Sequence, residues 1–382
     1  MAHLHAGTLV GPPLATTARA ASTPLIARAG LWTLIAGHLI ATWGTQWDIQ
    51  WHLTIGRDTF WIAPHVMTYS GVTIIVLTSF GVLAWMTLGG AAALGSSAIR
   101  VFGVSGTAGY QLAAWGIVLT VVAAPIDDLW HRLFGLDVTL WSPPHLLGLL
   151  GGIVNAAACW LIAEETYPAR SPARFTAIVL AGAFVYGGLA LGLLPGIRTA
   201  YTYGGIRFFT YPMLGALLAT LPLVATARLS KRRVFPVLVV LAVLALGITG
   251  AAISRLGFAW TKPTPFLAEE IAKDPTSPIA VSHEIARKNG TTPPAGNRGV
   301  MLIAVLAAVS MAAVDARRRP ALAALAFALT LFAGVGLLLA RLPAFAQSLP
   351  SLADAAVALV LTSIAALVAG TIAARAVRTP AP

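Results

Sequence analysis

The sequence predicts an all-α fold, a polytopic transmembrane helix bundle of about ten spans, and three observations support this class. Hydrophobic residues make up 58% of the 382 positions and charged residues only 10%, well below the roughly 25% charged residues of soluble domains. The apolar residues occur in runs of about 20, the helix length that crosses a hydrocarbon core roughly 30 Å thick. Alternating ten-residue segments with flanking aromatic girdles do not recur, which argues against a transmembrane barrel.

The spans are expected at residues 25–47, 68–94, 107–126, 144–163, 175–194, 208–227, 235–254, 299–314, 320–339 and 353–374. Residues 1–24 lack the compact apolar stretch of a secretory signal, so we expect a disordered cytoplasmic tail there. Residues 25–168 hold spans 1–4, residues 169–254 hold spans 5–7, and residues 299–382 hold spans 8–10 and the C-terminus. The polar, proline-rich segment 255–298 is expected to be a long outer loop with one short helix near 265–273. His283 and Glu284 in this loop are expected to be a solvated pair.

The net charge of +12 is explained by membrane orientation rather than by nucleic acid, for which no basic stripe with exposed aromatics is found. Dense basic runs occur at 228–233 and 317–319, both in loops on one side of the predicted bundle. Because Lys and Arg accumulate in cytoplasmic loops, we expect a multi-pass cell-membrane protein with both termini cytoplasmic. Its expected partner is the lipid bilayer, and association with other membrane subunits or as a homo-oligomer is an open alternative. The single cysteine, Cys159, excludes an internal disulfide and a thiolate metal cage.

A duplicated motif follows spans 1 and 3. The chain reads DIQWHLTIGRDTFWIAPH from Asp48 to His65 and DDLWHRLFGLDVTLWSPPH from Asp127 to His145. Each copy has an Asp, a His four residues later, a glycine, a second Asp and a Pro-His pair. Each leads from the outer end of one span into the next, so spans 1–4 are predicted to be two parallel copies of one helix–motif–helix unit.

The motif concentrates ionisable residues at the membrane surface, where each costs free energy. Asp48 and His52, like Asp127 and His131, are four residues apart and share one face of a helix that continues to that point. His65 and His145 follow prolines that suit the first turn of the next helix. One carboxylate and two imidazoles form a common ligand set for copper, iron or zinc. The sequence therefore predicts that Asp48, His52, His65, Asp127, His131 and His145 bind metal at the outer face.

Further charged residues lie beside the expected ligands. Asp58 and Asp137 are candidates for accepting a hydrogen bond that fixes the tautomer of a ligating imidazole. Arg57 offers an alternative partner for Asp58.

Two structural interpretations compete with metal binding. The acidic and imidazole groups can cap helix ends or pair with one another in headgroup water. A set of tryptophans near the outer ends is expected to form an interfacial aromatic belt: Trp43, Trp47, Trp51, Trp61, Trp130 and Trp141. His38, in the middle of span 1, is expected to face the bundle interior, as a buried hydrogen-bonded side chain or as an extra ligand.

Residues 51–65, WHLTIGRDTFWIAPH, resemble the metal-site segment in the C subunit of copper-dependent membrane monooxygenases, the particulate methane and ammonia enzymes. In that family an Asp, a His four residues later and a second His thirteen further bind copper, near an R-D-T pattern. Asp48, His52 and His65 keep these spacings, and Arg57-Asp58-Thr59 matches in place. The resemblance implies copper, an outward-facing site and oxygen chemistry on a small apolar substrate. The doubled motif departs from that family, as does the missing downstream Asn-x3-His.

The first functional hypothesis is therefore a membrane metal-binding protein, with copper favoured over iron or zinc, that acts as an oxidoreductase on a small apolar substrate. The alternative is a transporter or metal-handling protein that uses the same Asp/His residues for cations or protons, since parallel repeats occur among transporters. A third possibility, haem ligation by paired histidines, fits less well with the accompanying carboxylates.

Overall fold

The computed structural model describes residues 14–56, 60–90, 98–134, 141–293 and 298–377. Within these ranges nine segments, each a single helix or a run of consecutive helices, are long and apolar enough to cross a membrane. This confirms the predicted fold class. An isolated strand edge has no partner for its backbone groups in hydrocarbon, whereas a helix satisfies them internally. The chain is therefore a multi-pass membrane protein.

The helices and strands have the following bounds: α1 (Leu14–Thr54), α2 (Ala63–Trp85), η1 (Met86–Gly90), β1 (Ile99–Val101), β2 (Val104–Gly106), α4 (Ala108–Phe134), α5 (Pro143–Thr166), α6 (Pro172–Leu191), α7 (Leu194–Tyr203), η3 (Gly205–Phe209), α8 (Thr210–Leu218), α9 (Thr220–Ser230), α10 (Phe235–Thr261), α11 (Leu267–Lys273), α12 (Pro278–Lys288), α13 (Arg298–Val314), α14 (Pro320–Ala340), η4 (Pro343–Phe345) and α15 (Leu352–Ala376). The two short strands form an antiparallel hairpin, and they are the only strands in the described ranges.

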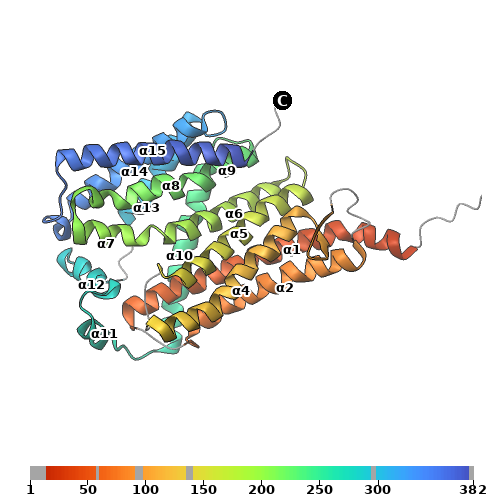
Figure 1. The fold of residues 1–382 in the computed structure, drawn as a ribbon, viewed down its shortest axis with the longest axis horizontal. Helices are drawn as coiled ribbons and strands as arrows, with labels where there is room; N and C mark the ends of the chain where they lie inside the picture. The colour runs from red at the N-terminus through yellow and green to blue at the C-terminus, as the bar shows by residue number, and fades with distance from the viewer. Residues whose placement is uncertain (1–13, 57–59, 91–97, 135–140, 294–297, 378–382) are drawn as a thin grey trace, which may run out of the picture.

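The bundle has two packed halves. One apolar core lies among α1, α2, α4, α5 and α6, and the other lies among α7 to α10 and α13 to α15. Helices α6 and α10 contact both halves. Figure 1 shows the halves as the red-to-yellow and green-to-blue parts of the ribbon, with α1 beginning and α15 ending away from α11 and α12.

Several predicted boundaries are wrong. Helix α1 begins at Leu14 and ends at Thr54, so part of the expected tail is helical and the helix continues past the apolar run. Helix α13 has 17 residues, about 26 Å at 1.5 Å per residue, slightly less than a hydrocarbon core of roughly 30 Å. The eighth predicted span is thus an apolar helix shorter than the other nine.

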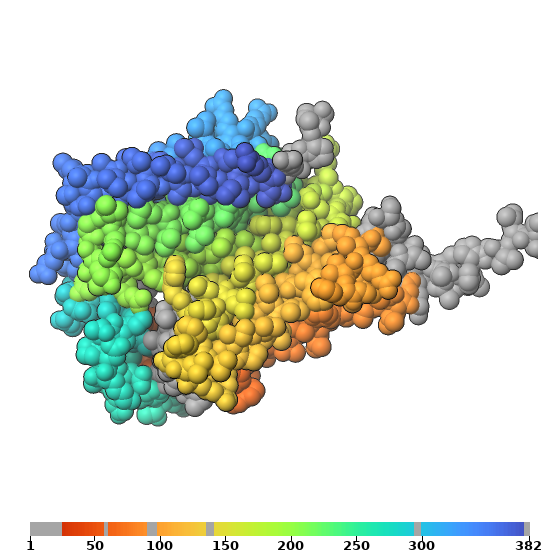
Figure 2. Space-filling model, in the orientation of Figure 1, coloured from red at the N-terminus to blue at the C-terminus, as the bar shows by residue number. Residues whose placement is uncertain are grey.

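The outer segment between α10 and α13 is more ordered than predicted. The expected short helix is confirmed as α11, but a second helix, α12, follows it. Figure 2 shows this segment as a teal lobe at one end of the molecule. His283 lies on α12, partly buried, and its Nε2 is 2.8 Å from the carbonyl oxygen of Leu53 on α1. The interpretation of His283 as a solvated loop residue was therefore wrong.

Of the six tryptophans of the expected belt, Trp43 and Trp130 are half-buried and the other four divide into two groups. Trp61 and Trp141 are exposed, as expected of an interfacial belt, but Trp47 and Trp51 are buried. Both pack against Phe258 of α10, so these two are core residues, contrary to the prediction.

The buried interpretation of His38 is confirmed. Its Nε2 lies 2.8 Å from Oδ1 of Asn155 on α5, and the Asn155 amide donates to the Ala113 carbonyl of α4 and to Ser79 of α2. This polar network joins four helices inside the bundle.

Candidate metal centres

The first cluster, Asp48, His52 and His65, lies where α1 ends and α2 begins. Because α1 continues to Thr54, Asp48 and His52 stand one turn apart on the same face. Gly56 has φ +111°, a backbone conformation that favours glycine, and it turns the chain out of α1. Helix α2 then starts with Pro64 at its N-terminal turn, which places His65 beside the end of α1.

The second cluster, Asp127, His131 and His145, has the same construction on α4 and α5. Helix α4 continues to Phe134 and carries both Asp127 and His131. Helix α5 begins with Pro143 and Pro144, so His145 is again in the first turn. The helix continuation and the position of the Pro-His pairs are confirmed in both motifs.

Both clusters bring their ligand atoms together. Asp48 Oδ1 lies 3.5 Å from His52 Nε2 and 3.0 Å from His65 Nε2. Asp127 lies 3.3 Å from His131 Nε2 through Oδ2 and 3.3 Å from His145 Nε2 through Oδ1. Donor atoms about 2.0–2.2 Å from one ion, at angles between square and tetrahedral, are themselves roughly 3 to 3.5 Å apart. The donor atoms of each cluster all lie within 4.8 Å of one another, and each set could hold a metal ion.

The hydrogen bonding of His65 calls for a positive charge beside Asp48. His65 Nδ1 lies 3.1 Å from the carbonyl oxygen of Phe60. A carbonyl only accepts, so we assign the proton to Nδ1. In the neutral ring Nε2 then presents a lone pair to the carboxylate of Asp48. Two acceptors at this distance repel each other unless a positive charge lies between them, and either a metal ion or a second ring proton on His65 could supply it.

One oxygen of each carboxylate is buried, but the side chains of both clusters remain partly exposed to solvent. Oδ1 of Asp48 and Oδ1 of Asp127 are buried and receive no hydrogen bond in the described part of the chain, although imidazole nitrogens are close. Such atoms cost free energy when no cation or donor compensates them. The six side chains retain between 17% and 32% exposure, so an ion held there would keep positions open to a small ligand.

The predicted neighbours of the ligands are only partly visible. Arg57, Asp58 and Asp137 lie outside the described residues, so their predicted roles remain predictions. Asp128, the residue after Asp127, forms an ion pair of 2.6 Å with Arg132. This pair separates Asp128 from the donor set of its neighbour Asp127.

The two clusters are separate groups of donors in the described structure. Tyr69 of α2 lies next to the first, with its ring centroid 5.7 Å from that of His65. Each cluster therefore has its own donor set.

Two features of the site were missed by sequence reasoning. One is the Phe60 carbonyl that orients His65, since the sequence does not reveal which backbone oxygen faces a side chain. The other is His283, which contacts α1 directly beside His52 from a helix 230 residues later in the chain. The sequence did contain a signal for that helix, the Ser277-Pro278 pair, because serine is a common N-cap and proline suits the first helical position. In the structure the Ser277 hydroxyl caps α12 by accepting from the amide of Ala280.

Comparison with known proteins identified no relative: no family model, no curated protein and no solved structure matches this chain.

Proposed function

We propose that the protein is a membrane metalloprotein in which each Asp/His cluster holds one copper ion, and that it acts as an oxidoreductase on a small apolar substrate. The observation that carries metal binding is the convergence of one carboxylate and two imidazole nitrogens in each cluster. Copper is favoured over zinc or iron by the resemblance of residues 48–65 to the copper site of the membrane monooxygenases. Imidazole-rich sites also rank copper(II) highest among the divalent ions.

The residues fit a redox-active ion. Each cluster has one carboxylate, so a divalent ion keeps a net positive charge, and its three protein donors leave coordination positions free. When bound, copper would supply one-electron chemistry at a position reachable from the membrane surface. The Asp and His residues hold the ion, and the Phe60 carbonyl fixes the tautomer of His65. The apolar helices around the clusters give a small hydrophobic molecule access from the bilayer.

Elemental analysis together with electron paramagnetic resonance on detergent-purified protein tests this proposal. We expect copper in excess of iron and zinc, and an axial copper(II) signal with hyperfine splitting from imidazole nitrogens. The signal should disappear on reduction and return when oxygen is admitted. His52→Ala should remove one component, whereas alanine at His3, which lies outside the described residues, is the matched control. Protein that contains only zinc, or a signal indifferent to His52→Ala, would refute the copper assignment.

A further inference from the structure

We propose that the two clusters are unequal metal sites: the first is preorganised by the outer segment of α10 to α12 and binds its ion tightly, and the second exchanges its ion more readily. This inference rests on the proposed function, because it presumes that both clusters bind metal. It assigns His283 and Phe266 as positioning residues of the first cluster.

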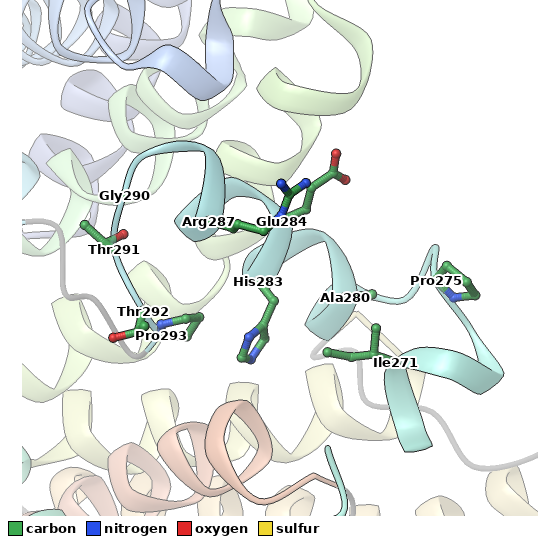
Figure 3. A pocket seen from close by; sticks show the side chains of 10 residues that line it. All are labelled: Ile271, Pro275, Ala280, His283, Glu284, Arg287, Gly290, Thr291, Thr292 and Pro293. Atoms are coloured by element: carbon green, nitrogen blue, oxygen red, sulfur yellow. The ribbon is translucent and has the colours of Figure 1, made fainter. Parts of the chain in front are cut away.

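The outer segment holds the last turn of α1 through two backbone carbonyls. His283 Nε2 lies 2.8 Å from the oxygen of Leu53, and the amide of Phe266 donates to the oxygen of Ile55 at 2.9 Å. The last four carbonyls of a helix lack partners within the helix. Figure 3 shows His283 directed from α12 toward α1, at the edge of a cavity of about 680 Å³. The segment therefore fixes the turn that carries His52.

Apolar packing holds the same turn from the side. Trp47, Trp51, Ile55 and Ile62 form a buried core with Phe258 and Phe266. Helix α10 approaches closely, because a Cβ at Gly257 would lie only 2.2 Å from the Trp47 ring. The helix end that carries Asp48 and His52 is thus packed against aromatic residues on one side.

The far end of α12 is anchored on the other half of the bundle. Lys288 Nζ lies 2.6 Å from the Tyr201 hydroxyl of α7, and Asn289 Oδ1 accepts from the amide of Ala344 at 3.0 Å. The outer segment is therefore a brace between the two halves and not a loose loop.

The end of α4, which carries the second cluster, is built differently. Pro125 lies inside the helix two residues before Asp127. Proline removes a backbone hydrogen bond and bends a helix. Leu129, Leu133 and Phe134 are all more than half exposed, whereas Trp47, Trp51 and Ile55 on α1 are buried. The apolar side chains at the helix end that presents Asp127 and His131 are therefore less covered by protein than those at the end of α1.

This difference has a predictable effect on affinity. Ligands held in place lose less freedom when an ion binds. Residues that support metal ligands typically change affinity about 10- to 100-fold. We therefore expect one resident ion at the first cluster and one exchangeable ion at the second.

A competitive titration of the full-length protein with copper(II) against a chelator of known affinity tests the inference. The parent should show two dissociation constants at least about tenfold apart. His52→Ala should remove the tighter one, and His131→Ala the weaker. His283→Ala should weaken the tighter site about tenfold or more and leave the weaker unchanged. His283→Gln, which can still donate to the Leu53 carbonyl, should restore the affinity. Arg287→Ala is the matched control, since it lines the same cavity and is exposed.

The outcomes separate the two proposals. A parent without bound copper refutes the proposed function. Two sites of equal affinity, or unchanged affinities in His283→Ala, overturn the inference and leave the function intact. If His283→Ala does not fold, Pro125→Ala decides the question: straightening α4 should tighten the weaker site, and an unchanged weaker site counts against the inference.

Discussion

Replacing Gly71 with alanine should disturb the first cluster from inside the membrane. Helices α1 and α2 are in backbone contact at this point: a Cβ at Gly71 would lie 2.5 Å from the amide nitrogen of Ala41 and 2.7 Å from the carbonyl oxygen of Gly37. Both are main-chain atoms, so neither can rotate away. Gly151 of α5 has the equivalent place six residues after His145, with Thr120 N at 2.6 Å.

The displacement can be estimated from these contacts. Ordinary van der Waals contact for a Cβ begins at 3.4 Å, so the helices must separate locally by 3.4 − 2.5, or about 0.9 Å. Gly71 is six residues from His65, about 9 Å along the helix at 1.5 Å per residue, so much of this shift should reach the ligand. Metal–ligand distances tolerate about 0.2 Å. We expect Gly71→Ala to weaken copper binding at the first cluster by about 10- to 100-fold, comparable to losing a supporting residue.

The assay is the same chelator competition, with neighbouring glycines as controls. Gly81 of α2 and Gly152 of α5 have open space where a Cβ would be placed, so alanine there should change neither affinity. Gly71→Ala should affect only the first site and Gly151→Ala only the second. Parental affinity at both sites in Gly71→Ala would refute the link between helix spacing and ligand geometry.

Three further predictions concern stability and orientation. Asn155→Ala should destabilise the protein by roughly 2–5 kcal/mol in reversible unfolding in micelles, because three interhelical hydrogen bonds are lost at about 0.6 to 1.7 kcal/mol each. A change below about 0.5 kcal/mol would contradict the network's importance. The pKa of Asp315 is lowered from 3.8 to about 2, first by the hydrogen bond from its arginine partner. A lowered pKa means that the stabilisation is present above pH 3.8 and lost as the pH falls toward 2. The free energy of unfolding of Asp315→Asn should therefore fall less between pH 3.8 and 2 than that of the parent. An equal fall in the two proteins would disprove this contribution. If the clusters face outward, Lys273→Cys in intact cells should react with a membrane-impermeant maleimide and Lys231→Cys should not. The native cysteine is buried and should give a low background. Labelling of Lys231→Cys but not of Lys273→Cys would mean that the clusters face the cytoplasm.

The sequence was sufficient for the fold class and for the grouping of the Asp and His side chains into two clusters, because both depend on local patterns. Apolar runs of membrane length predict spans directly, and the four-residue spacing of Asp48 and His52 predicts a shared helix face. The Pro-His pair predicts a histidine in the first turn of the following helix, and the structure places His65 and His145 there. The parallel repeat, the bound metal and the sidedness of the membrane are still predictions.

What the sequence could not supply depends on contacts between distant segments. Trp47 and Trp51 have the composition of an interfacial belt, and only the close approach of α10 at Gly257 buries them. His283 was interpreted as solvated because no local signal pairs it with the Leu53 carbonyl. Helix α1 continues past its apolar run to Thr54 because tertiary contacts, and not hydrocarbon alone, stabilise its C-terminal end. In each case contacts between segments distant in sequence determined a position that the local sequence alone predicts differently.

The central claim is that each Asp/His cluster holds one metal ion, and metal stoichiometry tests it most directly. The parent, Asp48→Asn, Asp127→Asn and the double variant should be purified identically, loaded with copper and freed of excess ion before elemental analysis. The account predicts two, one, one and zero ions per chain, with all four proteins equally folded. Equal stoichiometry in the four proteins, or a parent that retains no ion, would contradict it.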